Sequence, residues 1–100
     1  MSNNIYVDVD GTLVRNDVLN VKLVDWLKRQ KSRGYVLTLW SMRGVEYAKA
    51  AATKFGVTEL FSFILSKPNC IVDDCGWRWT RFSPSVSSFH LDLPLLTTSD

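Results

Sequence analysis

The sequence predicts an α/β domain in which helices flank a parallel sheet. Apolar strand-like runs alternate with helical patterns along the chain, and this alternation is typical of parallel strands joined by helices. The 100 residues are enough for one domain with one modest core. We therefore expect one domain at residues 1–82. Residues 83–100, rich in Ser, Thr and Pro, are expected to form a loosely ordered tail.

The first half of the chain contains a strand, a short connection and a helix. Residues 5–9 form an apolar run, and residues 13–20 are a polar-apolar connection compatible with a small hairpin. Asn20 is suited to cap a helix at residues 21–33, and Gly34 to end it. One face of this helix carries apolar side chains at helical spacing, namely Leu23, Val24 and Leu27.

The second half repeats the pattern with more strands. Residues 35–40 are apolar at nearly every position, which predicts a strand buried on both faces. Residues 44–56 predict a second helix, whose inward side chains are Val45, Ala48, Ala52 and Phe55. Residues 60–65 and 70–74 are interpreted as further strands. Residues 77–82 alternate in character and are compatible with a last edge strand.

Composition excludes several classes of protein. The formal net charge of +2 is too small to indicate nucleic-acid or membrane binding by itself. No apolar run approaches the roughly 20 residues of a membrane span, and the N-terminus lacks the pattern of a secretory signal. Cys70 and Cys75 do not have CxxC spacing. We interpret them as reduced thiols of a cytoplasmic protein.

Polar side chains follow the predicted strands at their carboxyl ends. In parallel sheets ligands bind beyond these ends, so we expect the side chains to converge on one crevice. Crowded carboxylates need neutralisation, and Mg²⁺ prefers a few carboxylates with waters and phosphate oxygens. The residues concerned are Asp8, Asp10, Ser41, Lys67, Asp73 and Asp74.

The same residues resemble the haloacid dehalogenase-type phosphohydrolase superfamily. Its four signatures occur in order as "DVDGT", a hydrophobic strand ending in Ser41, Lys67 and "VDD", and the likeness covers residues 4–74. An ordered set of motifs is more specific than a single one. The resemblance implies a three-layer Rossmann-like fold. In this arrangement we expect the strand bearing Asp8 to lie between those ending at Ser41 and Asp73.

The resemblance implies roles for the two aspartates of "DVDGT". Asp8 would be the nucleophile that forms an aspartyl-phosphate. Asp10 would protonate the leaving oxygen and later activate water, and its backbone carbonyl would bind the cation. Residues two apart on a strand face the same way, which suits this division of work. The implied activity is Mg²⁺-dependent hydrolysis of phosphomonoesters.

The remaining signature residues would bind phosphate and metal. Gly11 would allow a sharp turn, with Thr12 hydrogen-bonding within it. Ser41 would donate to a phosphoryl oxygen, and Lys67 would balance negative charge. The metal ligands would be Asp8 and Asp10 together with Asp73, Asp74 or both.

The intervals between motifs leave no room for a cap domain. Residues 14–33 hold a hairpin and one helix, and residues 42–66 hold one helix and one strand. We therefore expect an open site, which would suit either small phosphomonoesters or large substrates such as polynucleotide ends or phosphoproteins. A non-catalytic phosphoacceptor or binding module is an alternative. Response-regulator receivers, however, place their adjacent acidic pair first and their acceptor in mid-chain.

Several of these residues also have simpler interpretations. Ser41 is suited to cap the second helix, a role compatible with phosphate binding. Lys67 could be a solvated surface lysine. Arg15 and Arg43 could contact substrate or lie on the surface. The aromatic-basic stretch at 77–82 is more typical of packing than of base stacking.

Overall fold

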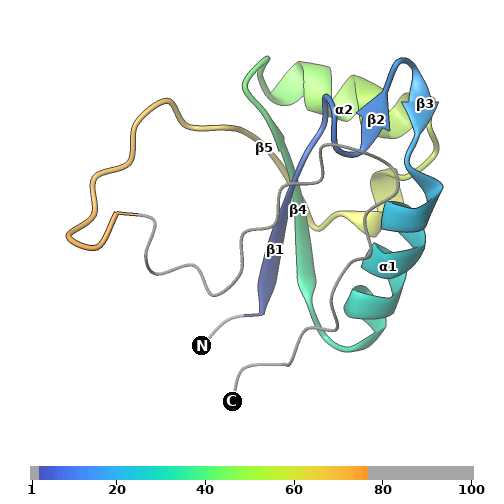
Figure 1. Ribbon diagram of the computed structural model, residues 1–100, viewed down its shortest axis with the longest axis horizontal. Coiled ribbons are helices and arrows are strands. Elements are labelled where there is room, and N and C mark those ends of the chain that lie inside the picture. The colour runs from blue at the N-terminus through green and yellow to red at the C-terminus, as the bar shows by residue number, and fades with distance from the viewer. Residues whose placement is uncertain (1–2, 77–100) are drawn as a thin grey trace.

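The computed structural model describes residues 3–76, and its centre is a parallel sheet of three strands. These are β1 (Asn4–Asp8), β4 (Val36–Ser41) and β5 (Phe63–Ser66), in the order β1-β4-β5 (Figure 1). Both neighbouring pairs are parallel. The predicted α/β class and parallel sheet are confirmed. The carboxyl ends of all three strands consequently meet at one edge of the sheet.

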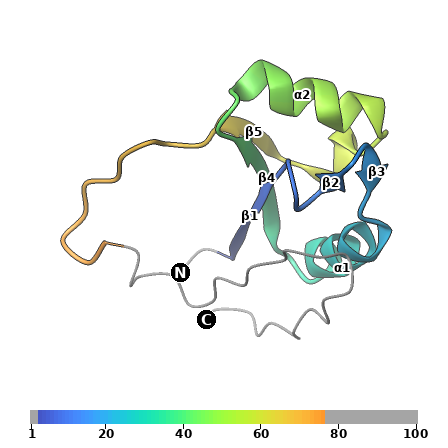
Figure 2. The ribbon, with the colours of Figure 1, turned by 45° about the horizontal axis from the view of Figure 1, so that its top comes forward.

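Two helices connect these strands and lie on the same side of the sheet. They are α1 (Val21–Ser32) and α2 (Val45–Lys54), and a 3₁₀ turn, η1 (Thr58–Leu60), follows α2. Figure 2 shows α1 and α2 on the same side of the sheet, with the β2–β3 hairpin between them. The predicted helices are therefore confirmed, and among residues 3–76 they form a layer on one face of the sheet only.

The hydrophobic core lies between this helical layer and the sheet. Alternate strand positions point into it, so that Val7, Leu37 and Leu39 are buried beneath the helices. The helices contribute the face that their spacing predicts. Their buried apolar side chains are Leu23, Val24, Trp26, Leu27, Ala48 and Ala52.

The opposite face of the sheet carries the side chains of the strand residues that alternate with the core positions. Tyr6, Phe63 and Leu65 are exposed there. The ring of Tyr6 packs edge-on against Trp40 with centroids 4.7 Å apart. No helix among residues 3–76 covers this face (Figures 1 and 2). The third layer of the predicted fold therefore stays a prediction.

The connection between β1 and α1 is the small hairpin that the sequence suggested. Strands β2 (Val14–Arg15) and β3 (Val18–Leu19) pair antiparallel. The two residues between them, Asn16 and Asp17, have φ values of 51° and 62°. Asn and Asp tolerate this left-handed region better than most residues, and two-residue hairpins require it at both positions.

The ends of α1 follow the sequence signals. The Asn20 side chain accepts a hydrogen bond from the Leu23 N–H at 3.1 Å, which satisfies one of the free N–H groups at the start of the helix. Gly34 follows the helix with φ of 95°. The predicted cap, span and stop are confirmed.

Residues 70–74 do not form the predicted strand, and this prediction is wrong. The run holds only three apolar residues, and two of them, Ile71 and Val72, are exposed. The Asp73 side chain accepts a hydrogen bond from the Cys75 N–H at 2.8 Å, a local turn that competes with strand pairing. Among residues 3–76, β1 therefore pairs only with β4 and lies at the edge of the sheet.

Other boundaries differ little from expectation. The strand predicted at 60–65 begins later, at Phe63 of β5, since Leu60 is the last residue of η1. The predicted edge strand at 77–82 and the tail at 83–100 lie outside the described residues. Within residues 3–76, no helix has the length and apolar character needed to cross a membrane.

Candidate functional site at the carboxyl ends of the strands

Three of the four signatures meet at the carboxyl edge of the sheet. Asp8 ends β1 and pairs with Trp40, the residue before Ser41. Ser41 ends β4 and pairs with Ser66, the residue before Lys67. The Lys67 N–H donates to the Ser41 carbonyl at 2.9 Å. Adjacent strands thus present a carboxylate, a hydroxyl and an ammonium group at one edge.

Asp8 is partly buried among groups that favour its charged form. Burial raises the pKa of its carboxyl above the ordinary value, because charge is poorly solvated there. The positive charge of Lys67 and hydrogen bonds from the Val9 N–H and the Thr12 hydroxyl act in the opposite direction. The Thr12 hydroxyl lies 3.5 Å from Asp8 Oδ2. The predicted hydrogen bond of Thr12 is therefore made to Asp8.

The turn after β1 is held by its own backbone. Gly11 has φ of 81°, a conformation that favours glycine, and its N–H donates to the Val14 carbonyl at 2.8 Å. The Leu13 N–H donates to the Asp8 carbonyl at 3.1 Å, and the Leu13 side chain is completely buried. Asp10 therefore lies on a turn that is fixed to the core from both sides.

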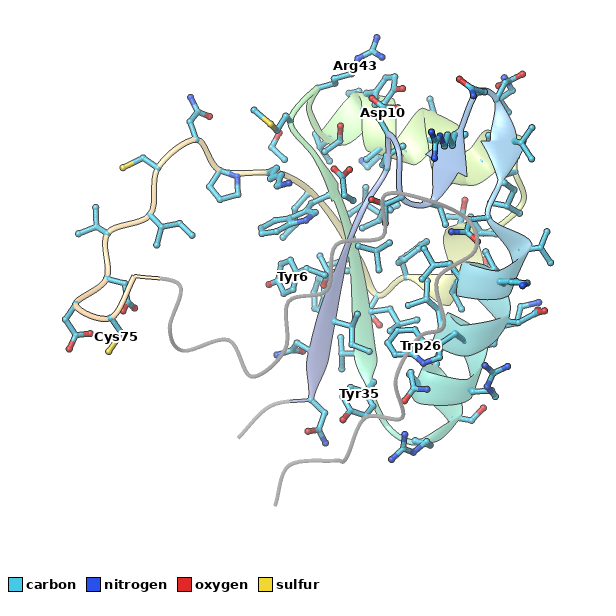
Figure 3. The ribbon with its side chains drawn as sticks, in the orientation of Figure 1. Tyr6, Asp10, Trp26, Tyr35, Arg43 and Cys75 are labelled. Atoms are coloured by element: carbon cyan, nitrogen blue, oxygen red, sulfur yellow. The ribbon has the colours of Figure 1, made fainter. Side chains whose placement is uncertain are left out.

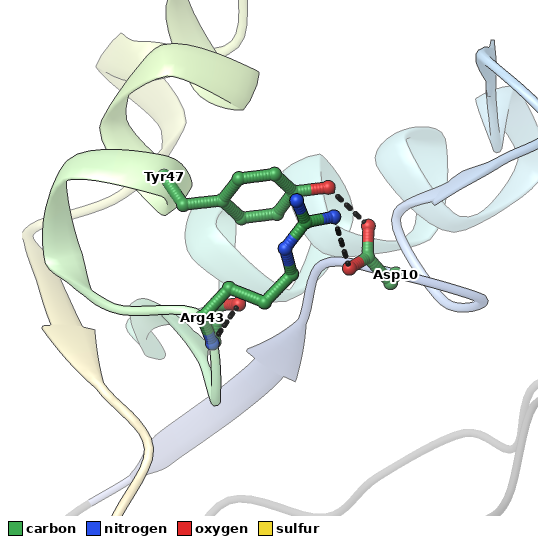
Figure 4. A network of polar contacts seen from close by, with 4 residues as sticks. Asp10, Arg43 and Tyr47 are labelled. Carbon is green, nitrogen blue, oxygen red and sulfur yellow. Dashed lines mark hydrogen bonds and ion pairs between the residues drawn. The ribbon is translucent and has the colours of Figure 1, made fainter.

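The carboxylate of Asp10 has one partner in the turn before α2 and another in the first turn of α2. The Tyr47 hydroxyl donates to Asp10 Oδ1 at 2.6 Å, and Arg43 Nη1 lies 3.6 Å from Oδ2. The Arg43 guanidinium also stacks 3.9 Å from the centre of the Tyr47 ring. Figure 4 shows the three side chains meeting between the turn and the helix. The bond to Asp10 raises the pKa of the Tyr47 hydroxyl.

Ser41 is buried and does not cap α2, so the N-cap prediction is wrong. The N-cap of α2 is Gly44, with φ of 103° and no side-chain cap. The Ser41 hydroxyl oxygen instead accepts a hydrogen bond from the Arg43 N–H at 3.0 Å. This bond uses a lone pair of Ser41 and leaves its hydroxyl proton available as a donor.

The acidic pair of the fourth signature lies elsewhere. Asp73, Asp74 and Cys75 are exposed, and their potential ligand atoms lie within 4.8 Å of one another. Figure 3 places Cys75 at the far end of an extended segment, well separated from Asp10. The structure therefore does not bring Asp73 or Asp74 to the edge that holds Asp8 and Asp10.

The oxygen donors at the strand ends suit a hard cation that keeps most of its own water. Asp8 and Asp10 lie two residues apart on the same turn, and the charge of Asp10 adds to the rise in the pKa of Asp8. A cation would relieve this repulsion. Mg²⁺ commonly uses one or two protein carboxylates and fills its other positions with water and phosphate oxygens. The Asp8 carboxylate and the Asp10 backbone carbonyl would meet this requirement without the distant pair.

The sequence did not predict Tyr47 as a site residue, and for Arg43 it left two alternatives, substrate contact or a surface position. The sequence predicts Tyr47 only as one position of the helix at residues 44–56 and gives it no role in the site. The available signal was their position shortly after Ser41, because Arg43 lies in the turn before α2 and Tyr47 lies in the first turn of that helix. The observed partner of the Arg43 guanidinium is Asp10.

The chain was compared with protein-family models, with curated proteins and with solved structures, and none of the three comparisons finds a match.

Replacing Asp8 should stabilise the fold in a pH-dependent way. Since folding raises the pKa of Asp8, the stabilisation from its protonated form is complete below the unfolded pKa of about 3.9. It is lost as the pH rises through the folded pKa. Asp8→Asn should therefore raise Tm at pH 7 in chelator, and the gain should shrink at pH 3.

Thermal denaturation followed by circular dichroism measures this difference. Asp25→Asn, which removes an exposed carboxylate of α1, controls for the loss of one negative charge. A gain in Tm for Asp8→Asn that is as large at pH 3 as at pH 7 would contradict the assignment of Asp8 as a carboxylate penalised by burial.

Proposed function

We propose that the chain is a Mg²⁺-dependent phosphomonoester hydrolase that forms an aspartyl-phosphate on Asp8. The observation that carries this proposal is the meeting of Asp8, Ser41 and Lys67 at the ends of three adjacent parallel strands. A partly buried carboxylate close to an ammonium group is a suitable nucleophile, and the buried Ser41 hydroxyl at the end of the neighbouring strand is a suitable donor to a phosphoryl oxygen. The capless three-layer Rossmann-like fold belongs to the same proposal.

The proposed reaction has two steps that share one phosphorus atom. In the first, an Asp8 oxygen attacks phosphorus, the ester P–O bond breaks, and Asp10 gives its proton to the leaving alcohol. In the second, water attacks the same phosphorus and gives its proton to Asp10. The bond between phosphorus and Asp8 then breaks and releases inorganic phosphate. Both carboxyl groups return to their starting state.

The neighbouring groups would stabilise charge during both steps. Lys67, whose charge already acts on Asp8, would offset the negative charge of the phosphoryl group. The available proton of Ser41 would bind one phosphoryl oxygen, and the Thr12 hydroxyl would hold Asp8 in place. Phosphoryl transfer depends mainly on such positioning and charge stabilisation. Mg²⁺, which the Asp8 carboxylate and the Asp10 backbone carbonyl would hold, would supply further positive charge at the phosphoryl oxygens.

The surroundings favour substrates that do not need an enclosing pocket. Met42 is 77% exposed beside Ser41, and the Asp10 and Arg43 side chains are both more than half exposed. Small phosphomonoesters would be bound weakly, whereas phosphorylated polynucleotide ends or proteins would bring contacts of their own. Cys70 and Cys75 are exposed, and neither forms a disulfide within residues 3–76, which suits a reducing compartment such as the cytoplasm.

Replacing the two aspartates should have different effects. Asp8→Asn removes the attacking oxygen and should abolish phosphoenzyme formation with every substrate. Asp10→Asn should cost about 10²- to 10⁴-fold in turnover, the usual contribution of a general acid–base. For the first step with p-nitrophenyl phosphate, the rate of Asp10→Asn should fall only slightly, because this leaving group needs little protonation.

Intact-mass measurement after rapid mixing distinguishes these outcomes, because Asp10→Asn should accumulate a phosphoenzyme that hydroxylamine removes. The panel should include alkyl phosphates and 3′- and 5′-phosphorylated oligonucleotides. Wild-type turnover by Asp8→Asn would contradict the proposed role of Asp8.

Removal of Mg²⁺ should abolish turnover, whereas replacement of Asp73 should leave the Mg²⁺ requirement nearly unchanged. Turnover of p-nitrophenyl phosphate should vanish with excess EDTA and return with Mg²⁺. For Asp73→Asn, the Mg²⁺ concentration that gives half-maximal activity should stay within about twofold of the wild-type value. The reason is that the Asp73 carboxylate accepts a local hydrogen bond from the Cys75 N–H. A large rise for Asp73→Asn would show that this pair reaches the site during turnover. Full activity in EDTA would contradict the metal requirement.

A further inference from the structure

We propose that Tyr47 and Arg43 are positioning residues that fix the Asp10 carboxylate for proton exchange with the leaving oxygen and with water. This inference rests on the proposed function, and it adds two residues to the site, Arg43 from the turn before α2 and Tyr47 from α2. Neither residue belongs to the four sequence signatures. Both act through Asp10, and in the described structure each holds a different oxygen of its carboxylate.

The bond from Tyr47 is the stronger of the two contacts. At 2.6 Å it lies at the short end of the range for O–H···O hydrogen bonds, about 2.5–3.0 Å. The ion pair of Arg43 is longer, and both of its side chains are largely exposed, so on its own it would contribute little. Tyr47 therefore contributes most to the position of the Asp10 carboxylate, and Arg43 restricts its second oxygen, Oδ2.

Tyr47 is itself held in place. Its side chain has few rotatable bonds, and the Arg43 guanidinium covers one face of its ring at 3.9 Å, within the range of a cation–π contact. The backbone N–H of Arg43 is in turn bonded to the buried Ser41 hydroxyl. Tyr47 and Arg43 together form a clamp on Asp10. This clamp connects the turn after β1 to Ser41, the residue that would bind the phosphoryl group.

The turn does not need this clamp for its own stability. Its backbone is closed by the bonds from Gly11 to Val14 and from Leu13 to Asp8, and Leu13 anchors it in the core. Tyr47 and Asp10 are 37 residues apart in the sequence, so the contact is not a product of local turn chemistry. Removing it should loosen one carboxylate and leave the fold intact.

Tyr47→Phe tests the inference because it deletes one hydroxyl and keeps the ring. The first-step rate with an alkyl phosphate should fall about tenfold, a fraction of the 10²- to 10⁴-fold contribution of a general acid. With p-nitrophenyl phosphate, that rate should change less than about twofold, because its leaving group needs little protonation. KM should be unchanged for both substrates. Arg43→Ala should show the same pattern with a smaller loss, and Arg43→Lys should recover part of it.

Two comparisons isolate the action through Asp10. In an Asp10→Asn background, Tyr47→Phe should cause no further loss, since the group that it positions is gone. Tyr6→Phe removes a hydroxyl from the exposed face of β1, and Lys49→Ala removes a positive charge from α2, the helix that carries Tyr47. Neither control should discriminate between the two substrates. Thermal denaturation should give the same Tm for wild type and Tyr47→Phe.

The outcomes separate this inference from the function on which it rests. A loss that is equal for alkyl and p-nitrophenyl phosphates, or that persists undiminished in the Asp10→Asn background, would overturn the positioning role while the hydrolase proposal stands. An unchanged Tyr47→Phe variant would do the same. A wild-type chain that turns over no phosphomonoester would overturn both.

Discussion

The parallel register of β1 and β4 is the constraint on which the candidate site depends. It places Asp8 opposite Trp40 and so beside Ser41, and the matching register of β5 brings Lys67 next to Ser41. Burial fixes this register, because Val7 and Leu39 face the core. A slip by one residue would turn these apolar side chains to the opposite face. Packing of the core therefore sets the geometry at the strand ends.

The candidate site lowers the stability of the fold. Burial of Asp8 penalises its charge, and Lys67 and the Thr12 hydroxyl offset part of that penalty. Asp10 adds to it. Carboxylates crowded without full compensation are characteristic of functional sites, whereas a turn needs no second carboxylate. A bound cation and a phosphoryl group would complete the balance of charge, and this accounts for the carboxylates of "DVDGT" in physical terms.

Local signals predicted much of the fold and of the site. Asn20, Gly34 and the apolar spacing of α1 predicted that helix because each acts within a few residues. The convergence of Asp8, Ser41 and Lys67 followed from strand polarity. The strand at 70–74 failed because a run of three apolar residues does not outweigh the local bond of Asp73. Tyr47 was missed because its partner is distant in sequence.

The central claim is that this arrangement makes Asp8 the site of phosphoryl transfer. Its most direct measurement is the location of the covalent phosphate. The chain would be mixed with p-nitrophenyl phosphate and Mg²⁺, quenched, reduced with borohydride and digested for tandem mass spectrometry. Borohydride converts an aspartyl-phosphate to homoserine, so the account predicts homoserine at position 8 and unmodified aspartate at position 10. Homoserine at any other aspartate, or at none during measurable turnover, would contradict it.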